Sequence, residues 1–169
     1  MHKQLSDYLA HNNLLFPSQY GFRKFHNTSF ATIDFLGKVA NSVDNGEFAF
    51  GVFIDLSKAF DTINHGLLLK KLKYYGINDL ALQWFSSYLA NRSQYVIWNG
   101  VSSTTLSIST GVPQGSVLGP LLFLLYINDL PKTTEILQLI LFADDSNLLL
   151  QGKNLSDMSK TLTTELGIN

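Results

Sequence analysis

Hydrophobic and polar positions along the chain predict a mixture of helices and strands. From Thr28 to Asp44 the apolar side chains recur at every third or fourth position, which is typical of an amphipathic helix. The almost wholly apolar segment 121–130 lies between Pro120 and Pro131, which favours a helix that begins at the first proline and ends at the second. Helical spacing also covers shorter segments: 5–13, 67–75, 80–89 and 155–166.

Apolar runs of strand length alternate with these helices. Residues 48–56 are largely apolar, which predicts a strand that is buried on both faces. Asn99-Gly100 joins the runs 95–98 and 101–108 and is a strong signal for a β-hairpin. Because strands and helices are interspersed along the chain, the fold class is α/β or α+β.

The last apolar runs enclose the most informative segment, Phe142-Ala143-Asp144-Asp145. Residues 137–142 lead into the two acids and residues 148–150 follow them, so we expect a buried hairpin with two carboxylates at its tip. Buried charge is costly unless it is paired or binds a metal, and neighbouring carboxylates repel each other. A divalent cation would remove both costs, although an Asp-Asp pair is also common in ordinary turns.

A further acidic residue, Asp55, follows Phe53-Ile54 at the end of the first predicted strand. If this strand lies beside the acidic hairpin, Asp55, Asp144 and Asp145 could together bind two Mg²⁺ ions about 4 Å apart. Oxygen ligands suit Mg²⁺, which completes its shell with water and substrate phosphates. A lone Asp at a strand end is more often a cap or turn residue, and Asp61 is best explained as a cap or a structural hydrogen-bonding residue.

Composition limits the classes of function that remain. The 169 residues fit one domain or a large part of one, with 46% hydrophobic and 15% charged residues. A net charge of −1 counts against the chain holding a nucleic-acid duplex alone, since such binders usually carry a basic excess. The absence of cysteine excludes disulfides and thiolate metal sites. With no bilayer-length apolar stretch and no signal-peptide pattern, we expect a soluble intracellular protein of the nucleus or the cytoplasm.

Two loops could contact a ligand. Residues 109–120 contain three glycines and two prolines before a predicted helix, so the backbone could approach a ligand and Gln114 could donate to a sugar or base. The pattern is not that of a P-loop, and an ordinary loop before a helix explains it equally well. In the loop 19–24, Arg23 or Lys24 could bind a triphosphate or could simply be solvated.

Six segments occur together in an order that is known from one family. In chain order they are Gln19-Tyr20-Gly21-Phe22-Arg23, Phe53-Ile54-Asp55-Leu56-Ser57-Lys58-Ala59-Phe60-Asp61, Trp84-Phe85-Ser86-Ser87-Tyr88-Leu89, Gly111-Val112-Pro113-Gln114-Gly115-Ser116-Val117-Leu118-Gly119-Pro120, Ile127-Asn128-Asp129-Leu130-Pro131 and Phe142-Ala143-Asp144-Asp145. Together they resemble the reverse transcriptase domain of non-LTR (LINE-type) retrotransposons. The resemblance implies an RNA-dependent DNA polymerase whose partners are an RNA template, a DNA primer and a dNTP, with no membrane.

The same resemblance implies an α+β fold: the palm of a right-hand polymerase, with an antiparallel sheet packed on helices, and part of the fingers. On this basis 1–169 is a fragment of the domain, in which about 1–46 are partial fingers and about 47–169 are mostly palm. Residues 65–110 would be a helix and hairpin insertion. The thumb would be absent, so missing polymerase regions or other chains would have to hold the duplex, which agrees with the near-neutral charge.

Residue roles follow from the matched positions. Asp55, Asp144 and Asp145 match the catalytic metal ligands, assisted by the backbone carbonyl of Leu56, and the implied cofactor is two Mg²⁺ with Mn²⁺ as a substitute. Phe60 matches the steric gate that excludes a 2′-hydroxyl, although its spacing alone favours a core aromatic. The remaining dNTP contacts implied by the resemblance are Gln114, Gly115 and Arg23.

Two other interpretations stay open on the sequence. A catalytically inactive retrotransposon remnant could keep the fold and act as a binding module for a partner or RNA. A palm-type nucleotidyl cyclase would share the acidic residues, but it would need neither the loop Pro113-Gln114-Gly115 nor the gate at Phe60.

Overall fold

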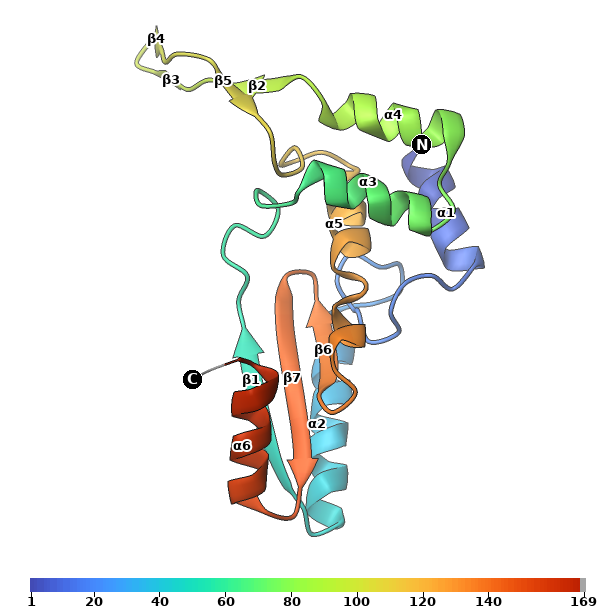
Figure 1. Cartoon of the computed structure of the whole chain (residues 1–169), viewed down its shortest axis with the longest axis vertical. Helices are drawn as coiled ribbons and strands as arrows, with labels where there is room; N and C mark the ends of the chain where they lie inside the picture. Colours follow the sequence, from blue (N-terminus) through green and yellow to red (C-terminus); the bar gives the residue numbers. More distant parts are fainter. Residues whose placement is uncertain (168–169) are drawn as a thin grey trace. The chain divides into compact units, whose positions relative to one another are not determined.

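The computed structural model describes residues 1–167 and combines helices with antiparallel strands, which confirms a mixed α+β class (Figure 1). The chain divides into two compact units, each made from two stretches of sequence. We call Met1–Leu14 with Lys58–Ile127 the helical unit, and Leu15–Ser57 with the residues from Asn128 onward the sheet unit. The division into fingers and palm near residue 46 stays a prediction.

The sheet unit is built on three antiparallel strands in the order β1 (Phe48–Ile54), β7 (Asp145–Gly152) and β6 (Gln138–Phe142). The central strand β7 pairs with β1 on one side and β6 on the other (Figure 1). Leucines at 148–150 are all buried, which is the burial expected for a strand covered on both faces.

Two helices cover the opposite faces of this sheet. On one face Ile140 and Leu149 pack with Ala31 of α2 (Thr28–Asp44). On the other face Leu148 and Leu150 belong to a cluster with Met158 of α6 (Leu155–Glu165). Alternate side chains of β7 therefore meet different helices, as the period of two in a strand requires.

Asparagine side chains begin three of the described helices. The Oδ1 atom of Asn27 accepts from the backbone N–H of Phe30 at the start of α2, and Asn154 does the same for Ser156 at the start of α6. In the helical unit, Asn64 caps α3 (His65–Tyr74). Each cap satisfies a backbone donor that has no partner within its helix, typically worth about 1 kcal/mol.

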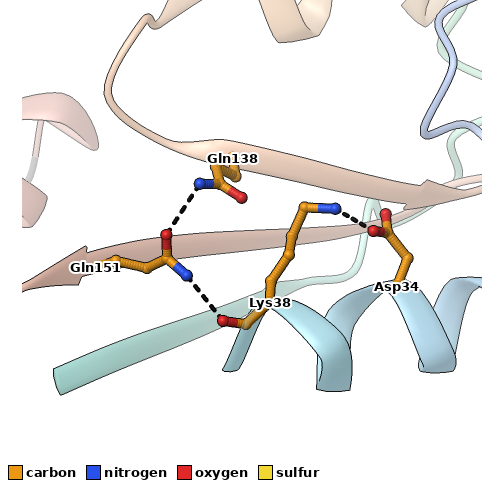
Figure 2. A network of polar contacts seen from close by, with 4 residues as sticks. All are labelled: Asp34, Lys38, Gln138 and Gln151. Atoms are coloured by element: carbon orange, nitrogen blue, oxygen red, sulfur yellow. Dashed lines mark hydrogen bonds and ion pairs between the residues drawn. The ribbon is translucent and has the colours of Figure 1, made fainter. Parts of the chain in front are cut away.

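Polar contacts fix α2 to the sheet at the end remote from the acidic turn (Figure 2). Gln151 of β7 donates to the carbonyl oxygen of Lys38 over 2.9 Å, and its side-chain oxygen accepts from Gln138 of β6 over 3.0 Å. Gln151 also contacts Ser42, and Lys38 forms an ion pair with Asp34 one turn earlier. The bonds to Lys38 and Ser42 give partners to the half-buried amide of Gln151 between α2 and the sheet.

The prediction that residues 48–56 form a strand buried on both faces is wrong in its burial. β1 ends at Ile54 and is an edge strand, so it has a pairing partner only along β7. Phe48 and Phe53 are 48% and 68% exposed. An apolar run of this length does not distinguish a central strand from an edge strand, because that depends on the order of strands in the sheet.

The core of the helical unit is formed by side chains of four helices: α1 (His2–His11), α3, α4 (Asp79–Leu89) and α5 (Gly119–Ile127). α5 is buried almost all round, as its uniformly apolar sequence predicts, and it packs against α3. It ends at Ile127, three residues before the predicted end, and a 3-10 turn at Leu130–Thr133 follows in the sheet unit. No helix in the described residues is long and apolar enough to cross a membrane.

The predicted hairpin around Asn99-Gly100 also forms, as two short ladders. β3 (Ile97–Trp98) pairs with β4 (Val101–Ser102), and β2 (Arg92–Gln94) pairs with β5 (Leu106–Ile108). Asn99 and Gly100 have φ angles of 48° and 79°, the left-handed values that this two-residue turn needs. Almost all of its side chains are exposed.

Candidate active site

The two acids lie where the sequence predicts them, at the tip of the buried β6–β7 hairpin. Phe142 pairs with Asp145, which leaves Ala143 and Asp144 as a two-residue turn. Asp144 is half-buried and Asp145 is exposed. Ala143 has a φ of 55°, a left-handed conformation that costs a residue with a β-carbon some free energy.

The structure brings Asp55 to the same end of the sheet. Ile54, the last residue of β1, pairs with Ser146 of β7. The ladder ends at this pair, which Asp55 follows directly after β1 and Asp145 precedes on β7. Asp55 is exposed, and Leu56 beside it is half-buried. The carboxylates of Asp55 and of the acidic turn thus lie at the same end of the three strands.

The carboxylates do not form a closed metal centre. Among the residues that the structure describes, no three His, Asp or Glu side chains gather closely enough to hold a metal ion. The donor set is nonetheless of the right chemistry, since oxygen ligands without His or Cys suit Mg²⁺, which keeps several waters and substrate oxygens in its shell. By donor type Asp55, Asp144 and Asp145 therefore suit Mg²⁺, and their role as its ligands stays a prediction.

A cavity of about 410 Å³ lies beside Asp145 on the face of the sheet that α2 covers. Phe35 of α2, Phe53 of β1 and Phe142 of β6 form its aromatic lining, and Asn147, two residues after Asp145 in β7, also lines it. The side chain of Asn147 is held by a bond to the carbonyl oxygen of Ile140. A carboxylate at the rim of a largely apolar cavity is a common setting for a binding site.

The acidic turn is held from outside by Gln19, a residue to which the sequence assigned no role. Its Oε1 atom accepts from the backbone N–H groups of Ala143 (3.0 Å) and Gly21 (2.8 Å), and its Nε2 atom donates to the Ala143 carbonyl oxygen (3.3 Å). Gln19 is 2% exposed. The only signal in the sequence was its place two residues before Gly21 in the matched segment, which indicated a family and not a contact.

Arg23 lies in the same loop, and its Nη1 atom faces the backbone. It donates to the carbonyl oxygens of Phe16 (2.9 Å), Gln19 (3.0 Å) and Pro17 (3.3 Å). Burial lowers the pKa of the Arg23 guanidinium, against a smaller opposing effect of Tyr20. Arg23 thus closes the loop that carries Gln19, and contact with a triphosphate stays a prediction.

Tyr20 is a second residue of this loop whose side chain is in contact with the rest of the sheet unit. Burial raises the pKa of the Tyr20 hydroxyl, and a hydrogen bond to the Asp34 carboxylate raises it further. The Tyr20 ring also lies 5.6 Å from the ring of His26. The loop meets α2 where Tyr20 packs against the cluster of Ala31, Ile140 and Leu149, and backbone bonds around Leu141 join it to β6.

The predicted dNTP-contacting residues Phe60, Gln114 and Gly115 belong to the helical unit. The ring of Phe60 packs on Phe123, with 4.6 Å between ring centroids. Gln114 donates from Nε2 to Oδ1 of Asp61 over 3.0 Å, so Asp61 has the structural role expected for it. Gly115 has a φ of 74°, which a residue without a β-carbon adopts readily.

Comparisons with known proteins agree with the resemblance. A family model described as reverse transcriptase (RNA-dependent DNA polymerase) matches residues 1–166. The chain is 33% identical over 144 residues to the RNA-directed DNA polymerase from mobile element jockey of Drosophila melanogaster, a match that covers 81% of this chain and 16% of that protein. It is 34% identical over 134 residues to the probable RNA-directed DNA polymerase from transposon BS of the same species, covering 76% and 14%.

A likeness to a solved chain of a partial Cas6-RT-Cas1–Cas2 complex is more distant. It covers 88% of this chain and 26% of that chain, with 23% identity and a TM-score of 0.41. The chain spans less than a fifth of the length of the two curated relatives named above.

Proposed function

Because this chain belongs to the reverse transcriptase (RNA-dependent DNA polymerase) family, we propose that it is the part of an RNA-directed DNA polymerase that carries the catalytic acids. One observation supports this most: by the register of β1 and β7, Asp55 lies at the same end of the sheet as the Ala143-Asp144 turn. The proposed substrates are a dNTP and a DNA primer paired to an RNA template. The names of the curated relatives support this substrate class.

Asp55, Asp144 and Asp145 are proposed to hold two divalent cations, with the carbonyl of Leu56 as a further ligand. Such ions would supply activation of the primer 3′-hydroxyl and neutralisation of charge on the leaving phosphate. The proposed role of this chain is to present the three carboxylates at one end of the sheet, where ions and substrate can reach them. The exposure of Asp55 and Asp145 supports that role.

The decisive experiment removes single charges from the proposed site. We expect Asp55→Asn and Asp144→Asn to reduce Mg²⁺-dependent dNTP incorporation on an RNA template on the order of 10³-fold, since metal-held charge stabilisation contributes several kcal/mol. Residues 1–169 would be assayed alone and also within a chimera, in which they replace the matching region of the jockey polymerase. Alone, we expect little processive synthesis.

The matched control is Asp157→Asn, which removes an exposed carboxylate from the first turn of α6 in the same unit. This change should leave incorporation within about twofold, since it costs a few tenths of a kcal/mol of helix-dipole interaction. Activity that survives both Asp55→Asn and Asp144→Asn would disprove the proposed site. Binding of Mn²⁺, followed by electron paramagnetic resonance, gives a second readout that does not depend on turnover.

Sugar selection is proposed to depend on Phe60. Phe60→Val should raise incorporation of rNTPs relative to dNTPs, because the smaller side chain would no longer exclude a 2′-hydroxyl. Phe123→Leu, which disturbs the same ring contact from the other side, is the control, and it should leave the ratio unchanged. An equal change of the ratio in both variants would assign Phe60 to the core and not to the nucleotide.

A further inference from the structure

We propose that Gln19 is a positioning residue of the polymerase reaction: its side-chain amide fixes the backbone of the acidic turn and so sets where Asp144 and Asp145 lie. The inference rests on the proposed function, because it concerns the same carboxylates. Within the part of the chain that the structure describes, the hydrogen bonds of the Gln19 side chain go to backbone atoms and not to those carboxylates.

The turn needs partners that its own hairpin does not give. The β6–β7 ladder ends at the pair Phe142–Asp145, so Ala143 has no partner across the ladder. Ala143 is also buried, at 5% exposed, where an unpaired backbone N–H or C=O is costly. Gln19 supplies an acceptor to the N–H and a donor to the C=O of this one residue.

The residue type matters because a neutral amide both donates and accepts. A carboxylate at position 19 would keep the two acceptor bonds to Ala143 and Gly21 but would face the Ala143 carbonyl oxygen with a negative charge. An apolar side chain of equal length would leave the backbone groups of Ala143 without Gln19 as a partner. Glutamine is therefore well matched to a peptide unit that lies outside a ladder.

The loop that carries Gln19 is fixed on β6 just before the turn. Tyr20 donates from its backbone N–H to the carbonyl oxygen of Leu141 over 2.7 Å, and Leu141 donates to that of Ser18 over 2.8 Å. Gly21 then passes so close to the turn that an added β-carbon would lie 2.1 Å from the backbone nitrogen of Ala143. Hydrogen bonds and close packing thus fix the position of the amide relative to the turn.

The expected consequence is a change in turnover and not in dNTP binding. A misplacement of reacting groups by about 1 Å can cost on the order of 10²-fold in rate. The proposed dNTP contacts Phe60, Gln114 and Gly115 lie in the helical unit, and Arg23 bonds to the backbone carbonyl of Gln19, which a change of the side chain keeps. Loss of the amide should therefore lower kcat and leave KM for the dNTP nearly unchanged.

The experiment compares Gln19→Met with Gln151→Met. Gln151 is the matched control because it also makes side-chain hydrogen bonds to its neighbours, on the same sheet but at the far end of β7. In the jockey polymerase that carries residues 1–169, we expect Gln19→Met to lower kcat about 100-fold with KM for dNTP within about threefold. Gln151→Met should reduce thermal stability similarly but keep kcat within about threefold of wild type, because it lies away from the turn.

A second variant keeps the proposal testable if Gln19→Met does not fold. Gln19→Glu has both a donor and acceptors only when its carboxyl is protonated, so its kcat relative to wild type should rise as pH falls. Wild type and Gln151→Met should not show this added dependence. A Gln19→Glu variant with a wild-type pH profile and wild-type kcat would overturn the proposal.

Hydrogen exchange of the Ala143 amide in residues 1–169 separates this proposal from the proposed function. Gln19→Met should speed that exchange at least about tenfold, while Gln151→Met should not. If the jockey chimera is inactive with the unchanged sequence as well as with every variant, the proposed function fails. Separately, unchanged exchange at Ala143 in Gln19→Met would overturn the role of Gln19. Equal losses of kcat in Gln19→Met and Gln151→Met would also overturn it, since both would then act only through stability.

Discussion

Two β-hairpins with two-residue turns, both within residues 1–167, are held in different ways. Asn99 and Gly100 adopt left-handed φ angles with residues that favour them, so the turn of the exposed hairpin is encoded locally. In the acidic hairpin a left-handed φ falls on Ala143, and the support comes from Gln19, 124 residues away in sequence. The acidic turn is thus held by tertiary contacts, whereas the exposed turn is favoured by its own sequence.

The strands of the two hairpins differ in the same sense. β6 and β7 are packed between α2 and α6, and their leucines are buried. Trp98 and Val101, which pair across the other turn, are 76% and 71% exposed. Burial of apolar side chains stabilises the first hairpin, at about 25 cal/mol per Å² of area removed from water, and contributes little to the second.

The largest loss of stability among these variants is expected for Gly21→Ala, which tests whether the acidic turn depends on the loop that carries Gln19. The added β-carbon would lie 2.1 Å from the Ala143 nitrogen, so either the loop or the acidic turn must move. We expect a loss of about 3 kcal/mol in the free energy of unfolding, at the upper end of overpacking costs. Urea unfolding followed by circular dichroism measures it, and exchange at Ala143 reports whether the turn has moved.

The control is Gly37→Ala, in the middle of α2 in the same unit. A β-carbon there has nothing within 4 Å, so alanine should stabilise the helix by about 0.5 to 1 kcal/mol. If Gly21→Ala instead kept the free energy of unfolding within about 0.5 kcal/mol of wild type, the loop could withdraw from the turn without cost. The acidic hairpin would then hold its own turn, as the exposed one does.

A smaller and local loss is expected for Gly100→Ala. The φ of 79° at Gly100 is unfavourable for alanine even though no atom lies within 4 Å of the added carbon. The left-handed conformation costs about 1 kcal/mol, which should destabilise β3 and β4 without altering global unfolding. Amide exchange of Ile97 and Ser102 should speed up by several-fold while the unfolding midpoint stays unchanged; a shifted midpoint would show that the hairpin is part of the cooperative core.

Periodicity and turn chemistry predicted the elements of the fold because they are local properties. The helix at 28–44, the Asn99-Gly100 hairpin and the acidic hairpin all formed within a few residues of their predicted bounds. The burial of 48–56 was wrong because strand order is a long-range property: β7, from the far end of the sequence, takes the central place.

For the candidate site, too, local features were predictable and long-range contacts were not. The residue type and chain position of Asp55, Asp144 and Asp145 indicate metal ligands, and this assignment stays a prediction. Gln19 could not be found in this way, because a buried amide that bonds to a distant backbone has no pattern in its own neighbourhood. The left-handed φ of its partner Ala143 was not predictable either, since alanine rarely adopts that conformation and so does not indicate it in a sequence.

The loop that holds the acidic turn should also respond to high pH, a weaker effect than the substitution at Gly21. The pKa of Tyr20 is raised by burial and by Asp34, so the folded state favours the protonated hydroxyl. That stability is fully present below the ordinary tyrosine pKa of about 10 and is lost as pH rises through the higher folded pKa. Urea unfolding from about pH 8 to 11 should show a decline in wild type that is smaller in Tyr20→Phe, whereas parallel curves would remove Tyr20 as its cause.

The smallest effect is expected at the tip of the exposed hairpin, for Trp98→Ser. Trp98 is 76% exposed, so its loss removes little buried area, and we expect the free energy of unfolding to stay within about 0.5 kcal/mol of wild type. Thermal and urea unfolding both measure this, with Leu149→Ala in β7 as the contrasting variant that should lose about 2 to 5 kcal/mol. A loss above about 1 kcal/mol at Trp98 would mean that packing stabilises this hairpin too, and the distinction between a locally encoded turn and an externally held one would fail.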